Sequence, residues 1–132
     1  GSKFILPVNG RLSGFFGSQR ILNSKPRRPH NGIDIAQKEG AEILAPASGK
    51  VKLVAHNMFF TGNTLIMDHG LGLISIFAHM KNINVEEGQY IDIGQKVGEV
   101  GMTGRATGPH LHWGVYLLEK PVDPLSLVGS EF

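Results

Sequence analysis

The segment NTLIMDHGLGLISIFAH (residues 63–79) holds two apolar runs separated by a short glycine-rich stretch. Asn63–Asp68 and Leu73–His79 have the composition of short strands and are bounded by turn residues. The stretch Asp68–Gly72 between them is predicted as the loop of a β-hairpin. The segment therefore predicts two neighbouring antiparallel strands.

Glycine and proline punctuate the rest of the chain in the same way, with 18 Gly and 7 Pro among 132 residues. No window has sustained helical periodicity, and the best candidate for a short helix is Pro124–Val128. Further strands are predicted at Ile33–Ala36, Gly49–Ala55, Lys96–Val100 and His110–Leu118. Short strands at this spacing predict an all-β fold, a compact antiparallel sandwich or barrel-like core, in one domain over residues 3–130.

Composition limits the classes of function. The chain has no cysteine, so any metal site needs His and carboxylate ligands. No run approaches the roughly 20 apolar residues of a membrane-spanning helix. Gly1-Ser2, and with them Glu131-Phe132, are interpreted as cloning remnants, which leaves open a membrane anchor or regulatory segment outside this sequence.

Arg20, Lys25, Arg27 and Arg28 form a basic cluster, although the net charge is only +2. Two interpretations stay open: a solvated loop, or a patch that binds an anionic substrate. No aromatic residues alternate with these charges, so a nucleic-acid partner is not expected.

His110-Leu111-His112 lies in a predicted strand. Residues two apart on a strand face the same side, about 6.6 Å apart along the chain, so Leu111 is expected to point into the core. One imidazole can bind a metal at about 2.0–2.1 Å while the other lies beside a bound water. The pattern predicts one ligand and one acid–base group without deciding which is which. Two solvated histidines are the alternative.

His30 and Asp34 can share a metal only if the chain bends between them, because an extended chain would hold them about 13 Å apart. Asn31-Gly32 favours such a bend. Asp34 would then lie on a short strand between two core isoleucines, where a carboxylate needs a cation. A metal would supply that cation, and Arg27 or Arg28 is the alternative.

Two histidines and one aspartate match a catalytic zinc with an open fourth position. The sequence has no HExxH helix and no Gly-x-Ser-x-Gly turn, so histidine is expected to transfer the protons. His79 is a candidate because it ends an otherwise apolar strand. His56 and His69, each beside a predicted turn, are interpreted as structural or solvated.

A biotinyl or lipoyl carrier domain is a rival class, because its strands are also punctuated by glycine. Such carriers display a modifiable lysine at a hairpin tip between small or Met neighbours. Met80-Lys81-Asn82 is the nearest approach, and it lacks the flanking pattern. The sequence therefore disfavours a carrier.

Four motifs lie along the chain: HNGIDIA (residues 30–36), APASGKV (residues 45–51), FAH (residues 77–79) and the segment from Gly104 that ends in GPHLHW (residues 108–113). They occur in the order seen in lysostaphin-type, or LytM-type, zinc endopeptidases of peptidoglycan. The chain resembles this family from about Phe4 to Leu127. The resemblance implies an antiparallel β core whose long loops form a zinc-containing groove.

The resemblance also implies the roles of single residues. His30, Asp34 and His112 are expected to hold one Zn²⁺ per chain, and His79 and His110 to be catalytic. The expected mechanism is hydrolysis at zinc, in which the two catalytic histidines transfer protons or stabilise the tetrahedral oxyanion.

The family hydrolyses amide bonds in the peptide part of peptidoglycan, so stem peptides are the expected partner and the cell envelope, periplasmic or membrane-anchored, the expected location. The basic cluster favours a D-alanyl–diaminopimelate cross-link, which carries carboxylates, over pentaglycine. Many relatives have a tyrosine where this chain has Phe77, and the only tyrosines here are Tyr90 and Tyr116. A non-catalytic module that binds or activates a wall hydrolase is the alternative, although such proteins typically lose zinc ligands.

Overall fold

The structure, a computed structural model, describes residues 3–18, 21–22, 25–26 and 30–129. Its strands are β1 (Arg11–Gly14), β2 (Ile21–Leu22), β3 (Lys25–Pro26), β4 (Ile33–Ala36), β5 (Glu42–Leu44), β6 (Gly49–Met58), β7 (Gly62–Gly70), β8 (Leu73–Ile83), β9 (Tyr90–Ile91), β10 (Lys96–Val100), β11 (His110–Leu117) and β12 (Lys120–Val122). A 3₁₀ helix, η1, covers Pro124–Leu127 and agrees with the predicted short helix. In these parts of the chain, no helix has the length and apolar character needed to span a membrane.

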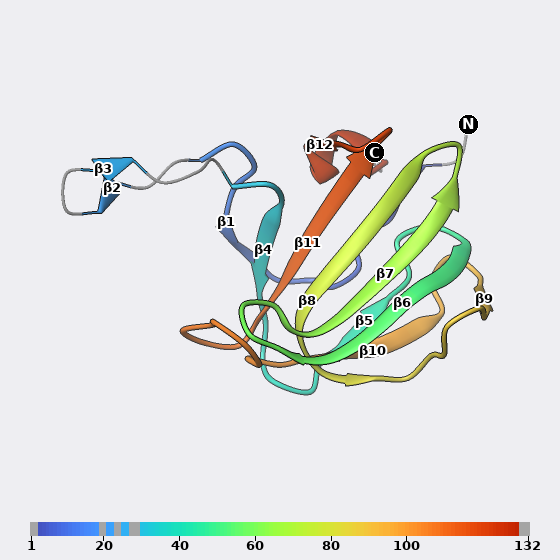
Figure 1. The fold of residues 1–132 in the computed structure, drawn as a ribbon, viewed down its shortest axis with the longest axis horizontal. Coiled ribbons are helices and arrows are strands. Elements are labelled where there is room, and N and C mark those ends of the chain that lie inside the picture. Colours follow the sequence, from blue (N-terminus) through green and yellow to red (C-terminus); the bar gives the residue numbers. More distant parts are fainter. Residues whose placement is uncertain (1–2, 19–20, 23–24, 27–29, 130–132) are drawn as a thin grey trace.

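Ten of the described strands form one antiparallel sheet (Figure 1). Its main path runs β1-β4-β11-β8-β7-β6-β9, while β10 pairs with β5 and β8, and β12 pairs with β11. This confirms the predicted all-β antiparallel fold and all six predicted strands. The sheet is curved (Figure 1). It is open, because its main path has two ends, β1 and β9.

The hairpin predicted at the centre of the chain is present, but its loop is shorter than expected. Residues 68–70 continue β7, and Gly70 pairs with Leu73 of β8. The turn is therefore only Leu71-Gly72, with φ of 55° and 83°. The strand continues through His69 because the His69 ring is held by hydrogen bonds to Ser48 O and to Ser75 Oγ.

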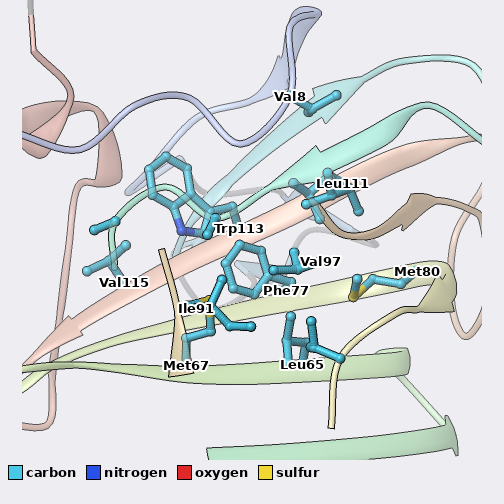
Figure 2. Close-up of a cluster of buried hydrophobic side chains, with 14 of the residues drawn as sticks. Val8, Leu65, Met67, Phe77, Met80, Ile91, Val97, Leu111, Trp113 and Val115 are labelled. Carbon is cyan, nitrogen blue, oxygen red and sulfur yellow. The ribbon is translucent and has the colours of Figure 1, made fainter. Parts of the chain in front are cut away.

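The core lies on one face of the long strands (Figure 2). Trp113 of β11, Phe77 of β8 and Met67 of β7 come from adjacent strands and are fully buried. Ile91 of β9 and Val97 of β10 are buried in the same cluster. Because side chains alternate along a strand, the neighbours of these residues point to the outer face of the sheet. That outer face carries the candidate site.

Candidate active site

Asp34 is placed by the pairing of two strands that are far apart in sequence. Ile33 and Ile35 are buried in the core, so Asp34 points to the outer face. In the register of β4 and β11, His112 lies directly opposite Asp34. The His112 Nδ1 donates to Asp34 Oδ1 at 2.9 Å. Strand register alone therefore brings a carboxylate and an imidazole together.

His30 reaches the same carboxylate because the chain bends at Asn31-Gly32, as predicted. The His30 Nε2 donates to Asp34 Oδ2 at 2.9 Å. The rings of His30 and His112 stack with their centroids 5.0 Å apart. A Cβ on Gly32 would lie 2.6 Å from Trp113 O and 3.0 Å from His112 Cε1, so the bend requires glycine here.

Gly14 keeps the third side of this cluster open. It pairs with Asp34 from β1, and a Cβ at this position would contact Asp34 Oδ2 and lie 3.0 Å from His30 Nε2. Gly14 is not among the residues that the sequence motifs point to. No local signal could have revealed it, since its role depends on the pairing of β1 with β4.

The donor set of His30, Asp34 and His112 could hold a metal ion. One ligand atom from each of the three lies within 4.8 Å of the other two. Tetrahedral zinc with bonds of about 2 Å needs ligand atoms about 3.3 Å apart, and each histidine already lies 2.9 Å from an Asp34 oxygen. Burial opposes ionisation of the Asp34 carboxyl, but hydrogen bonds from His112 and His30 outweigh it and hold the Asp34 pKa well below its usual range. A carboxylate that stays ionised is what a cation requires.

His79 and His110 face this cluster and are oriented by backbone carbonyls. His79 Nδ1 donates to Thr103 O at 2.7 Å, and His110 Nδ1 donates to Gly108 O at 2.9 Å. These bonds place the proton of each neutral ring on Nδ1 and leave the lone pair on Nε2. His110 Nε2 lies 3.8 Å from Asp34 Oδ1. The centroids of the His79 and His110 rings lie 4.8 Å apart.

The backbone at His79 is unusual for a residue in a strand. Its φ is 64°, and its N–H donates to Thr61 O at 2.7 Å in the turn between β6 and β7. A positive φ is uncommon outside glycine and is often found at functional sites. Burial lowers the pKa of His79, and the charges of His110 and His112 lower it further, against the hydrogen bond to Thr103 O. Burial therefore favours the neutral form of the ring.

Not every predicted feature lies in the site. Arg20, Arg27 and Arg28 fall outside the described residues, as does the side chain of Lys25. An arginine beside Asp34 stays a prediction, and in the described part of the chain the ion pairs of Asp34 are all with histidines.

The remaining histidines and the candidate carrier lysine lie elsewhere. His56 is exposed and His69 belongs to the core face. Lys81 lies within β8 rather than at a hairpin tip, which removes the basis of the carrier alternative. Phe77 is fully buried, so the position that holds tyrosine in many relatives faces the core here.

A family profile described as peptidase family M23 matches residues 28–124, which include all five predicted site residues. The chain belongs to this family. Among curated M23 relatives, the chain is 39% identical over 97 residues to the peptidoglycan DD-endopeptidase ShyB of Vibrio cholerae, a match that covers 74% of the chain and 22% of ShyB. The chain spans between 22% and 37% of the length of the curated relatives compared.

Solved structures of similar proteins have the same fold. A zinc-containing peptidase from Vibrio cholerae is 32% identical, with a TM-score of 0.87, over 99% of the chain and 41% of that protein. The catalytic domain of lysostaphin from Staphylococcus simulans is 26% identical, with a TM-score of 0.78, over 89% of the chain and 91% of that domain. The resemblance to the lysostaphin-type family is thus confirmed.

Proposed function

We propose that the protein is a zinc-dependent endopeptidase that hydrolyses amide bonds in peptidoglycan cross-links in the cell envelope. The observation that carries this proposal is the pair of inward-facing imidazoles, His79 and His110, beside a three-residue donor set in an M23 chain. Peptidoglycan stem peptides are the partner that this activity requires. ShyB and ShyA, both named peptidoglycan DD-endopeptidases, support this reading.

His30, Asp34 and His112 are the proposed ligands of one Zn²⁺. Their chemistry fits the ion, because two neutral imidazoles and one carboxylate leave a net positive charge and an open position. The ring atoms that now face the Asp34 carboxylate, His30 Nε2 and His112 Nδ1, are the proposed donor atoms. When bound, the zinc would supply a Lewis acid for the scissile carbonyl and for water.

His79 and His110 are the proposed catalytic residues. Each has its Nδ1 proton held by a backbone carbonyl, so Nε2 is the atom that can take a proton from water or return it to the leaving amine. Once protonated, the same atom can donate to the developing oxyanion, a contribution of about 3–4 kcal/mol per donor. Two such groups allow one ring to accept a proton while the other stabilises charge.

The proposed bond is the D-alanyl–diaminopimelate cross-link. A diaminopimelate residue carries free carboxylates near the scissile amide, and guanidinium groups bind carboxylates bidentately. The basic cluster of residues 20–28 precedes the first proposed ligand, His30, in the sequence and contains such groups. A pentaglycine bridge offers no charge of this kind.

The test digests purified walls with the zinc-loaded protein. Walls with direct diaminopimelate cross-links should release cleaved peptides, and walls with pentaglycine bridges should release far fewer. Arg27→Ala and Arg28→Ala should reduce this preference. Preferred cleavage of pentaglycine, or indifference to both substitutions, would refute the assignment of the bond. Failure to cut either wall, together with stimulation of a separate hydrolase, would favour the non-catalytic module instead.

A further inference from the structure

Two neighbouring turns form one wall beside His79. The turn between β6 and β7 (residues 59–61) and the loop before β11 (residues 101–109) lie side by side, green and orange in Figure 1. Arg105 N donates to Phe60 O at 2.9 Å and Asn63 N donates to Thr103 Oγ1 at 3.0 Å, so the two turns are joined. We call the side chains of Phe59, Phe60 and Arg105 on this wall the aromatic–arginine ledge.

The ledge exposes two large apolar side chains to solvent. Phe59 is 66% exposed and Phe60 67% exposed, and their rings pack edge to face at 4.7 Å. Met58 and Met102, next to the same two turns, are also exposed. Exposed apolar groups that gather in one place often mark a binding surface.

Arg105 lies over both rings. Its guanidinium carbon is 4.9 Å from the centre of the Phe59 ring and 5.9 Å from that of Phe60. Stacking of this kind orients the guanidinium and leaves its N–H edge available for a planar anion. None of the ion pairs seen among the described residues involves Arg105.

The ledge is attached to the reacting groups through the backbone. His79 donates one hydrogen bond to each turn. Its backbone N–H donates to Thr61 O and its Nδ1 donates to Thr103 O, both at 2.7 Å. Phe60 directly precedes Thr61, and Arg105 follows Thr103 by two residues. A ligand group held on the ledge is therefore held at a fixed position relative to His79.

We propose that the aromatic–arginine ledge binds a free carboxylate of the substrate peptide, with the aliphatic carbons beside that carboxylate packed on Phe59 and Phe60. This inference rests on the proposed function for the choice of substrate class. A bidentate pair with Arg105 fixes the carboxylate, and the rings favour a residue that carries apolar carbons next to it. The rings alone would also suit the apolar face of a sugar, but a fixed guanidinium favours the anionic peptide.

Binding of an uncleaved peptide tests this without relying on turnover. The probe is the tetrapeptide L-alanyl-γ-D-glutamyl-diaminopimelyl-D-alanine, titrated calorimetrically into the zinc-loaded protein. Three further probes are amidated at the glutamyl, the diaminopimelyl or the terminal D-alanyl carboxylate, which distinguishes the sources of the anion. Arg105→Gln should weaken binding of the free peptide about 10- to 100-fold.

Amidation of the contacted carboxylate should cause the same loss in the wild type and no further loss in Arg105→Gln. Phe59→Ala should weaken binding less, and Arg105→Lys should restore only part of it. Lys120→Gln is the matched control, because it removes a positive charge at the far end of β11 and should bind as the wild type does.

Equal affinity in the wild type and Arg105→Gln would overturn the inference, as would no measurable binding of the peptide. Tight binding of a peptide-free glycan strand that is lost in Phe59→Ala would also overturn it, in favour of a sugar site. Absence of wall cleavage, in contrast, would contradict the proposed function while the binding result still decided the role of the ledge.

Discussion

The two faces of the sheet hold histidines in opposite surroundings. On the core face, Trp113 Nε1 donates to Ser75 Oγ at 3.1 Å, and Ser75 Oγ donates to His69 Nε2 at 2.7 Å. His69 Nδ1 then donates to Ser48 O at 2.9 Å. Each of these polar atoms has a protein partner. We call this chain of hydrogen bonds the His69 network.

On the outer face, several imidazoles share one hydrogen-bond acceptor. One carboxylate, that of Asp34, accepts hydrogen bonds from His30 and His112 and lies 3.8 Å from His110 Nε2. Three imidazole nitrogens gather around this one carboxylate, and among the described residues no lysine or arginine forms an ion pair with it. The hydrogen-bond partners, rather than the histidines themselves, therefore separate the two roles. A closed network stabilises the fold, whereas an open cluster is suited to an added cation and a reacting water.

The largest effect is expected from removing the imidazole of His79, which faces the donor set of His30, Asp34 and His112 but is not part of it. His79→Ala should lower turnover on peptidoglycan about 10²- to 10³-fold, because it removes a group that moves a proton or stabilises the oxyanion. Zinc content should not change. Wall digestion and metal analysis measure the two quantities.

Two further variants serve as controls for this prediction. His79→Asn separates chemistry from backbone strain, since asparagine tolerates the φ of 64° better than alanine. It should be as inactive as His79→Ala. His56→Ala, at an exposed histidine, should behave as the wild type. Wild-type turnover in His79→Ala would mean that His79 is a structural residue like His69.

The second-largest effect is expected from a substitution in the His69 network. Ser75→Ala should lower the free energy of unfolding by about 1–3 kcal/mol, because the buried Nε1 of Trp113 and Nε2 of His69 both lose their partner. Urea denaturation measures this loss. Zinc content and turnover per folded molecule should be unchanged.

A serine with an exposed hydrogen bond provides the control. Ser126 Oγ donates to Asp123 O at the surface, and Ser126→Ala should change stability by less than about 0.5 kcal/mol. If Ser75→Ala costs no more than Ser126→Ala, the His69 network does not stabilise the fold.

The smallest effect is a dependence of stability on pH. Burial lowers the pKa of His69 below its ordinary value of 6.5, despite the hydrogen bond to Ser48 O. The unfolded chain therefore binds this proton at a higher pH than the folded chain does. Stability is complete above pH 6.5 and decreases as the pH falls below it, until the folded pKa is passed.

The contribution of His69 can be isolated by difference. His79 shifts in the same direction, so urea denaturation of the metal-free wild type should be compared with that of His69→Gln between pH 7.5 and about 5. The variant should be less stable at pH 7.5 but should lose less stability on acidification. Parallel pH curves for the two proteins would show that His69 titrates alike in both states.

Some of this comparison could be predicted from short stretches of sequence. The alternation in Ile33-Asp34-Ile35 and in His110-Leu111-His112 assigned faces correctly, because strand periodicity is local. The bend at Asn31-Gly32 was likewise predictable from its dipeptide. The strand alternation and the bend thus predicted which histidines and which aspartate lie on the outer face, without any knowledge of strand pairing.

The rest depended on contacts between distant segments. His112 and Asp34 meet only through the register of β11 on β4, and Ser75 reaches His69 only through that of β8 on β7. The sequence around His69 therefore predicts only a structural or solvated histidine and names no partner. The carbonyls of Thr103 and Gly108 have no signature of residue type, since every residue has a carbonyl. The short strand β1, which brings Gly14 to the site, has no apolar run to predict it.

The zinc content of the purified protein tests the central claim most directly. Elemental analysis after zinc loading and desalting should find about one zinc per chain in the wild type and in Ser75→Ala. Asp34→Ala, and independently His112→Ala, should lose most of the zinc while circular dichroism still reports the β fold. Full zinc occupancy in both of these variants, or no zinc in the folded wild type, would contradict the assignment of the outer-face cluster as a metal centre.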